Sequence, residues 1–347
     1  MEEKQFRDKV YWLTFLFSLL VVWVHSFNGE LFMGTPEAAF KVAGIERILG
    51  DGLGQIAVPG FFMVSSYLFF RGFCWEKLIP KWRSRLRSLV LPYLLWNFLY
   101  YMGYVAATRL PGLSGVVGKS PIPFNGPRLF DALVFYSYNP VFWYLFQLLL
   151  LVVLAPFLYW IICRKWSGLL WLLLLITALW KNVSLPILNL DALFYYSAAG
   201  YAVLFSEKVE GENTSSGKKI WFAILILCWL TLWFLGRPGA TLHFTPVHTV
   251  LTRLLGVLIF YSILKEIPFR PATSTVKNSF FLYAIHFPWA RFFNKAGAVL
   301  FKGNQGAAAV FFLTMPFLIL GISKVLGELL KHTVPGIYEI LSGGRGQ

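Results

Sequence analysis

The recurrence of long apolar runs along the whole chain limits its fold more than any other feature. Ten runs alternate with short polar or basic segments, and they cover residues 10–27, 55–70, 88–108, 141–162, 168–185, 190–206, 219–236, 247–264, 279–299 and 307–330. A helix of about 20 apolar residues spans the ~30 Å hydrocarbon core of a bilayer, because an α-helix rises about 1.5 Å per residue. The sequence therefore predicts an all-α, polytopic integral membrane bundle of about ten transmembrane helices.

The composition agrees with a membrane protein and excludes an ordinary soluble domain. Hydrophobic residues make up 57% of the chain and charged residues only 14%, against about 25% charged residues in soluble domains. Since no polar segment outside the runs is long enough to fold by itself, we expect one transmembrane domain over residues 1–347 without a separate soluble domain. The predicted location is the plasma membrane, with membrane lipid around the bundle.

The Lys and Arg residues that give the net charge of +15 lie mostly in the loops between the runs. With the N-terminus in the cytoplasm, twenty Lys and Arg residues fall in cytoplasmic segments and ten in outer segments, while Arg253 falls inside a run. Cytoplasmic loops of membrane proteins carry such an excess of Lys and Arg. The distribution therefore predicts that both termini are cytoplasmic, and it explains the basic charge without a nucleic-acid partner.

Three ionisable residues inside apolar runs are candidates for chemistry. His25 lies near the outer end of the first run, His286 lies within FFLYAIHFPW, and Arg253 lies in the run 247–264. Such residues are costly in a bilayer and mark functional sites by default, and histidine transfers protons near neutral pH. The competing interpretations are a packed histidine that is satisfied by hydrogen bonds and an arginine that reaches toward the outer interface.

Two segments between the runs also stand out. The basic segment Lys77–Arg87 is expected from topology and from contact with anionic lipid head groups, or its arginines Arg83, Arg85 and Arg87 could bind the phosphates of a nucleotide-like ligand. The outer segment 109–139 is rich in Pro and Gly and is predicted to be irregular, either as a lid or as a plain connection. No HExxH, CxxC or DxD motif is present, so no metal site is predicted.

Five segments, taken together and in order, resemble the membrane acyltransferase 3 family. They are VVWVHS around His25, VPGFFMVSSYLFF (Val58–Phe70), KWRSRLRSLVLPYLLWN (Lys81–Asn97), NPVFWYLFQLLLLVVLAPFLY (Asn139–Tyr159) and SFFLYAIHFP (Ser279–Pro288). The chain departs from the family pattern at three places. Thr14 stands where many relatives carry an arginine eleven residues before the histidine, Ser65-Ser66 replaces Ser-Gly, and Phe146-Gln147 replaces a charged pair.

The resemblance implies an O-acyltransferase that takes an acyl group, commonly acetyl, from an acyl-coenzyme A. The acceptor would be a hydroxyl group of a cell-envelope glycan or a related molecule. His25 would act as general base or would accept the acyl group covalently. The expected contacts to the transition state or the acceptor are Ser66, Tyr67, Trp143, Arg253 and His286, while Arg83, Arg85 and Arg87 would hold the coenzyme phosphates.

Two other classes stay open from the sequence. A transporter or flippase for a glycan or a lipid-linked precursor would also be polytopic and cationic, and it could use His25 and Arg253 as binding groups. A membrane sensor without chemistry would not need His25. No motif in the loops encodes a sugar preference, the length of the acyl chain or an oligomeric state.

Overall fold

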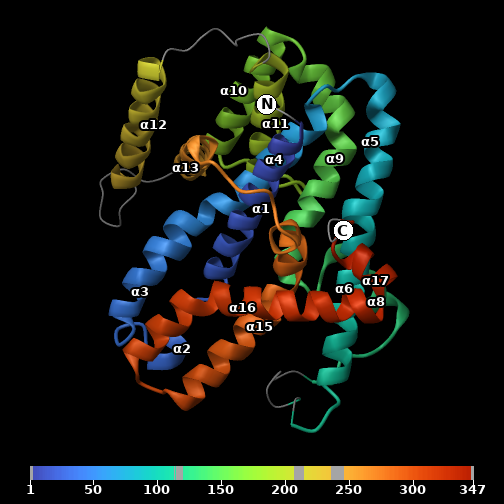
Figure 1. The fold of residues 1–347 in the computed structure, drawn as a ribbon, viewed down its shortest axis with the longest axis vertical. Helices are drawn as coiled ribbons and strands as arrows, with labels where there is room; N and C mark the ends of the chain where they lie inside the picture. Colours follow the sequence, from blue (N-terminus) through green and yellow to red (C-terminus); the bar gives the residue numbers. More distant parts are fainter. Residues whose placement is uncertain (1–2, 113, 115–119, 207–214, 236–245, 345–347) are drawn as a thin grey trace. The chain divides into compact units, whose positions relative to one another are not determined.

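The computed structural model describes residues 3–112, 114, 120–206, 215–235 and 246–344. Every regular element among these residues is a helix, which confirms the all-α prediction (Figure 1). The chain forms two compact units: residues 1–74 with 154–325, and residues 75–153 with 326–347. The expectation of one membrane domain over residues 1–347 stays a prediction.

The first unit contains the first helix and most of the second half of the chain. Its elements are α1 (Glu3–Val24), α2 (Gly29–Met33), α3 (Phe40–Glu46), the π-helical turn η1 (Arg47–Leu53), η2 (Gly54–Ile56), α4 (Ala57–Phe70), α10 (Lys165–Trp180), α11 (Leu190–Ser206), α12 (Ser215–Leu235), α13 (Pro246–Glu266), α14 (Ser274–Lys277), α15 (Ser279–Leu300) and most of α16 (Gln305–Thr333).

The second unit is smaller. Its elements are η3 (Trp75–Lys77), α5 (Leu78–Arg85), the π-helical turn η4 (Leu86–Val90), α6 (Leu91–Ala107), α8 (Gly126–Phe135), η5 (Pro140–Phe142) and α17 (Pro335–Leu341). The helix α9 (Trp143–Ile162) begins in this unit and ends in the first one.

The helix α1 is the centre of the first unit because other helices cover it on several sides. The fully buried ring of Phe17 lies 5.5 Å from the rings of both Phe61 and Phe260, which come from α4 and α13. A Cβ atom at Gly60 would lie 2.2 Å from the Phe17 ring, so only glycine allows this approach of α4 to α1. Packing along α1 therefore fixes the position of its C-terminal end.

The helices α1 and α15 run in parallel with one register. The Ser18 hydroxyl donates a hydrogen bond to the Ser279 carbonyl at 3.1 Å, and seven residues further along both helices the rings of His25 and His286 meet. Seven residues are about two helical turns, which returns each chain to nearly the same face. Small residues such as these two buried serines let membrane helices approach closely.

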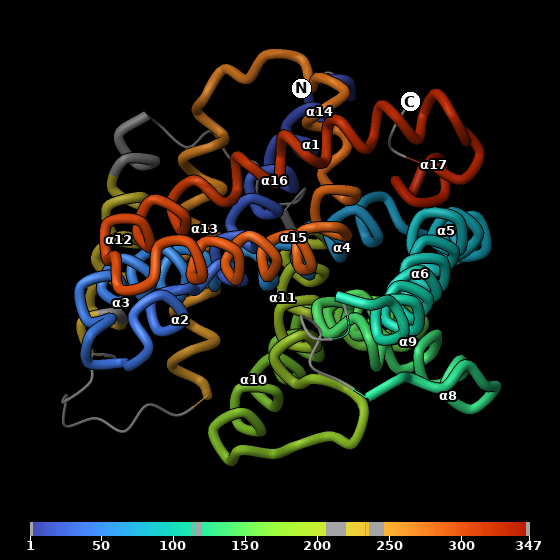
Figure 2. Tube along the Cα trace, turned by 90° about the horizontal axis from the view of Figure 1, so that it is seen from below, coloured from blue at the N-terminus to red at the C-terminus, as the bar shows by residue number. Residues whose placement is uncertain are grey.

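The segment after His25 packs against the C-terminal end of α15 and the N-terminal end of α16. The helices α2 and α3 lie beside the turn that joins those two helices in both views (Figures 1 and 2). Phe32, Val42, Ala298 and Ala308 form one buried apolar cluster there, and the Gly303 amide donates to the Phe32 carbonyl at 2.8 Å. These short helices were not predicted from the sequence, because none of them is an apolar run.

Among the described residues, six helical stretches are long and apolar enough to cross a membrane. They are Glu3–Met33, Phe40–Phe70, Trp75–Ala107, Pro140–Ile162, Pro246–Glu266 and Gln305–Thr333, and shorter apolar helices cover Lys165–Trp180, Leu190–Phe205 and Ile220–Leu232. The predicted run 279–299 is a helix, α15, but it falls in neither group. The count of about ten spans and the orientation of the termini therefore stay predictions.

The prediction that residues 109–139 are irregular is wrong over Gly126–Phe135, which forms α8. The Asn125 side chain accepts a hydrogen bond from the Arg128 amide at 3.0 Å and thereby caps the helix. Pro127 in the first turn supports the same start, because proline fits a position whose amide has no partner within the helix. Residues 113 and 115–119 of this segment lie outside the described residues.

Candidate active site

His25 lies directly after the last residue of α1. Its amide still donates to the Val21 and Val22 carbonyls, at 3.2 and 3.1 Å, so the backbone continues the last helical turn. The half-buried imidazole lies with its centre 5.2 Å from the His286 ring and 5.5 Å from the Phe287 ring, which it meets edge to face. The structure therefore brings together the two histidines that the sequence singled out inside apolar runs.

His286 is fully buried, and its two ring nitrogens have different surroundings. Nδ1 is hydrogen-bonded to the Tyr283 carbonyl. Since a carbonyl only accepts, Nδ1 carries the hydrogen in this bond, and in a neutral ring Nε2 then carries the lone pair. Among the described residues Nε2 has no hydrogen-bond partner. A buried acceptor without a partner is costly, so this nitrogen is ready to accept a proton or a hydrogen bond next to His25.

A buried polar network holds the segment that follows His25, residues 26–29. The Glu46 carboxylate accepts hydrogen bonds from the amides of Asn28 and Gly29, at 2.6 and 3.0 Å. The Asn294 amide group accepts from Asn28 Nδ2 at 3.2 Å and donates to the Ser26 carbonyl at 3.0 Å. Since Asn28, Glu46 and Asn294 are nearly inaccessible to solvent, this network fixes the backbone immediately beyond the histidine.

Neither Glu46 nor Asn294 was predicted from the sequence. Asn294 lies eight residues after His286 on α15, just over two turns along the helix, so it was detectable as a polar residue on the same flank. Glu46 lies on α3 outside the predicted runs, and only the folded structure shows that its carboxylate is buried.

Arg253 lies at the same end of the first unit as His25. Its Nη2 donates to Gln55 Oε1 at 2.8 Å. The neighbouring Gly54 packs so closely on α1 that a Cβ atom there would lie 2.6 Å from Val24, the residue before His25. The segment η1–η2 thus connects Arg253 to the end of α1.

Charged and polar groups from other elements lie near Arg253. Its guanidinium interacts electrostatically with Asp51 of η1 and Asp191 of α11, and it also interacts with the Tyr195 side chain. The arginine is therefore part of a polar cluster at the His25 end and not a cation that reaches out alone.

Ser66 and Tyr67 lie toward the opposite end of α1. The buried Ser66 hydroxyl donates to the Tyr196 carbonyl at 2.5 Å, which gives it a packing role between α4 and α11. The Tyr67 ring lies 5.8 Å from the ring of Phe6, and Phe6 precedes His25 by 19 residues, or about 28 Å along a helix. The structure therefore does not bring these two residues to His25.

The position of the missing arginine is occupied by a hydroxyl group. The Thr14 hydroxyl donates to the Val10 carbonyl at 3.0 Å and lies 3.5 Å from the Ser279 hydroxyl. Ser18, one turn further along, bonds to Ser279 as well. A seam of small hydroxyl side chains thus joins α1 and α15 below the histidine pair.

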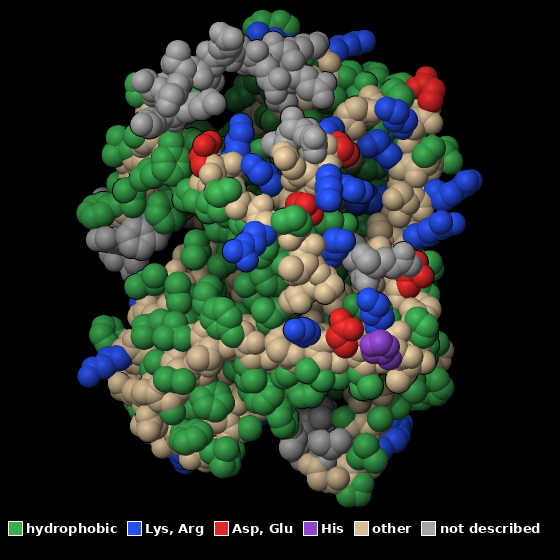
Figure 3. Space-filling view, in the orientation of Figure 1, with side chains coloured by type: hydrophobic (Ala, Val, Ile, Leu, Met, Phe, Trp, Pro, Cys, Tyr) green, Lys and Arg blue, Asp and Glu red, His purple; other side chains and the backbone are tan. Residues whose placement is uncertain are grey.

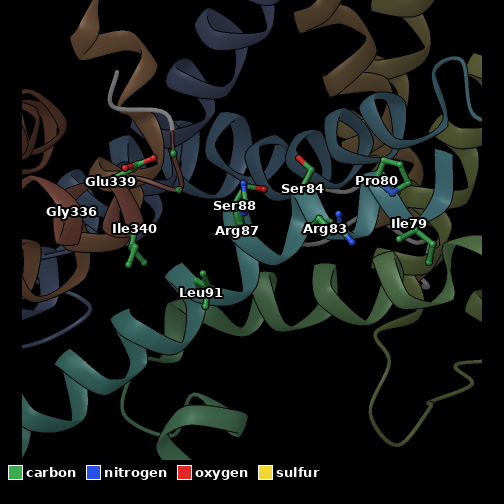
Figure 4. Close-up of a pocket in the computed structure, with 12 residues that line it drawn as sticks. Ile79, Pro80, Arg83, Ser84, Arg87, Ser88, Leu91, Gly336, Glu339 and Ile340 are labelled. Carbon is green, nitrogen blue, oxygen red and sulfur yellow. The ribbon is translucent and has the colours of Figure 1, made fainter.

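The second unit contains the predicted phosphate-binding arginines and a cavity of about 830 Å³ (Figure 4). This volume is within the usual range of ligand pockets. Arg83 and Arg87 line the cavity, together with Ser84 and Ser88, whereas Arg85 does not. Residues four apart lie on one helix face and residues two apart do not, so the helix divides the three predicted arginines. Trp143, the remaining candidate, begins α9 in the same unit.

Lys and Arg side chains gather over α5 on the face seen in Figure 3. Among the described residues, Arg83 and Arg87 have no hydrogen-bond or ion-pair partner. The indole of Trp82 anchors α5 by donating to the Val152 carbonyl at 2.9 Å. These two guanidinium groups, one on α5 and the other on the adjoining turn η4, make a site suited to a phosphate-bearing ligand.

The sequence of this chain matches a family of membrane acyltransferases. Residues 10–323 match the model of the acyltransferase 3 family, described as an acyltransferase domain, and the chain belongs to this family. It is accordingly a multi-pass protein of the plasma membrane. The chain is similar to the succinoglycan biosynthesis protein ExoH of Rhizobium meliloti (strain 1021), with 25% identity over 86% of this chain and 81% of that protein. No solved structure matches it.

Proposed function

We propose that this protein transfers an acyl group, acetyl in the simplest case, from acyl-coenzyme A to a hydroxyl group of a cell-envelope glycan. The observation that carries the proposal is the contact between the His25 and His286 rings, together with a buried His286 Nε2 that has no hydrogen-bond partner within the described part of the chain. The glycan as acceptor is supported by the name of the similar Rhizobium protein, which refers to the biosynthesis of succinoglycan.

In this proposal His25 is the general base. A sugar hydroxyl is protonated at neutral pH, so its oxygen attacks the thioester carbonyl well only if a base takes the proton as the new C–O bond forms. Such assistance is typically worth 10²–10⁴-fold in rate. The tetrahedral intermediate then expels the coenzyme thiolate as the C–S bond breaks, and the proton held by His25 passes to the thiolate.

His286 is proposed as a positioning residue and not as a substrate contact, since it is fully buried. With Nδ1–H held by the Tyr283 carbonyl, its Nε2 can accept a hydrogen bond from one ring nitrogen of His25. That bond would leave the lone pair of the other His25 nitrogen for the acceptor hydroxyl. A covalent acyl–His25 intermediate would need the same free nitrogen, so both routes use this arrangement.

Arg253 is proposed to stabilise the developing oxyanion near His25, since it lies at the same end of α1 and its guanidinium is held by Gln55. The proposed site for the donor phosphates is the Arg83–Arg87 face of the second unit. Ser66 and Tyr67 are left out of the chemical step because they lie far along α1 from His25.

The test compares envelope glycans from a strain that lacks the protein and carries the wild type, His25→Ala, His286→Gln or His332→Ala. His332 is the matched control, because its side chain is exposed and lies 4.0 Å from the Glu328 carboxylate, away from His25 in the sequence and outside the proposed site. We expect ester-linked acyl groups, measured by NMR before and after mild alkali, in the wild type and in His332→Ala. We expect none in His25→Ala and at least a tenfold reduction in His286→Gln at equal protein levels.

Ester groups at the wild-type level in His25→Ala would refute the catalytic assignment. A transporter or flippase gives a different pattern, in which loss of the protein lowers the amount of exported glycan and leaves its acylation unchanged. For His286→Gln, initial rates with purified protein separate positioning from folding. A positioning role lowers kcat and leaves KM for acyl-coenzyme A unchanged.

A further inference from the structure

The cavity in the second unit has two walls from segments that are far apart in the sequence. One wall is α5 with η4, and the other is α17 with the turn that follows it. In Figure 4 the labelled residues run from Ile79 and Pro80, through Arg83 and Arg87, to the Glu339 end on α17. The family match ends at residue 323, so the second wall lies outside the matched segment.

The wall formed by α17 is held in place by hydrogen bonds and by buried side chains. The Trp96 indole donates to the Leu341 carbonyl at 3.0 Å, and the side chains of Tyr338 and Leu341 are buried. The turn after the helix contains two glycines, Gly343 and Gly344, with φ values of 65° and 71°, and the Gly344 amide donates to the Glu339 carbonyl at 2.8 Å. Only glycine adopts this left-handed backbone readily.

The charged side chains that line the cavity carry opposite charges on its two walls. Arg83 and Arg87 come from the first wall and Glu339 comes from the second. Among the described residues, the Glu339 carboxylate has no hydrogen-bond or ion-pair partner. Guanidinium groups bind phosphate, whereas a carboxylate accepts hydrogen bonds and repels phosphate. A ligand that fills this cavity must therefore present phosphate to one wall and hydrogen-bond donors to the other.

We infer that α17 is the second wall of the donor site and that Glu339 makes this site selective for ligands with hydrogen-bond donors beside their phosphates. The inference rests on the proposed binding of the donor at Arg83 and Arg87. A coenzyme A fits the requirement, because it carries phosphates together with hydroxyl, amine and amide groups. Inorganic pyrophosphate carries only the anionic part, so Glu339 selects against it.

The test measures binding to the purified full-length chain in phosphatidylcholine nanodiscs. Coenzyme A and inorganic pyrophosphate are titrated separately against the wild type, Glu339→Gln and the matched control Glu328→Gln, which loses the same charge outside the cavity. We expect Glu339→Gln to bind coenzyme A about tenfold more weakly, because a hydrogen bond to a charged group becomes one to a neutral group. We expect it to bind pyrophosphate about fivefold more tightly, because a nearby like charge is gone. Glu328→Gln should match the wild type for both ligands.

The outcomes separate this inference from the donor site itself. If the wild type binds coenzyme A and Glu339→Gln binds both ligands with unchanged affinity, the role of α17 is overturned and the donor site is retained. A wild type that does not bind coenzyme A overturns the donor site. Repeating the titration in nanodiscs with phosphatidylglycerol tests the other source of phosphate, a lipid head group. Complete loss of coenzyme A binding there would make the cavity a lipid site and would overturn the inference too, whereas unchanged binding supports it.

Discussion

The buried carboxylate of Glu46 supports the segment that follows His25, so its removal should affect stability and catalysis together. Glu46→Ala deletes the acceptor of two buried backbone amides, those of Asn28 and Gly29. Each unsatisfied buried donor costs about 1–3 kcal/mol, and water that enters the space vacated by the side chain recovers part of the loss. We therefore expect the free energy of unfolding to fall by about 3 kcal/mol. Glu46→Gln keeps one acceptor oxygen without the charge, and it should cost about 1 kcal/mol.

The assay is denaturant unfolding of the purified protein in mixed micelles, followed by tryptophan fluorescence, with acyl-transfer rates measured on the same preparations. Glu30→Ala is the matched control, because Glu30 is exposed on the adjacent helix α2 and has the same charge. We expect Glu30→Ala to leave stability and rate within error of the wild type. Wild-type stability in Glu46→Ala would refute the view that this carboxylate holds the loop beyond His25.

Two further predictions concern packing and charge in the first unit. Gly60→Ala should lower the free energy of unfolding by about 1–3 kcal/mol, because the new methyl group would meet the Phe17 ring of α1. Gly44→Ala on α3 has open space and should be neutral or slightly stabilising by the same unfolding assay. Arg253→Gln should lower kcat for acyl transfer by at least tenfold with little change in KM, and Arg253→Lys should retain part of the rate. Equal rates in all three proteins would exclude Arg253 from the chemical step.

Residue types that are costly in a bilayer led from the sequence to His25, His286 and Arg253, and the structure places all three at one end of α1. Their partners were not predictable in the same way. The contact between His25 and His286 depends on the parallel register of two helices that are about 260 residues apart in the chain. The hydrogen bond from Ser18 to Ser279 fits this register, and no local sequence pattern predicts it.

The structure separates some of the predicted site residues from the others for a physical reason. Ser66 and Tyr67 belong to a family-like motif, but a motif gives no height along the membrane normal, and α4 presents them near Phe6. The three arginines of the basic segment looked equivalent as a charge run. A helical period of 3.6 residues then separates Arg85 from Arg83 and Arg87. Position in three dimensions, not residue type, decided each of these cases.

Position 14, where Thr14 replaces the arginine of many relatives, belongs to the contact between α1 and α15 and not to the surroundings of the general base His25. Thr14 precedes His25 by eleven residues, which is about 16 Å along α1, so the head group of a side chain there lies far below the imidazole unless it extends along the helix. In this protein the hydroxyls of Thr14 and Ser18 join α1 to Ser279 at that level. The group that lies beside the His25 ring is His286, whose buried Nε2 needs a hydrogen-bond donor. The reactivity of His25 should therefore depend on position 286 and be nearly indifferent to position 14.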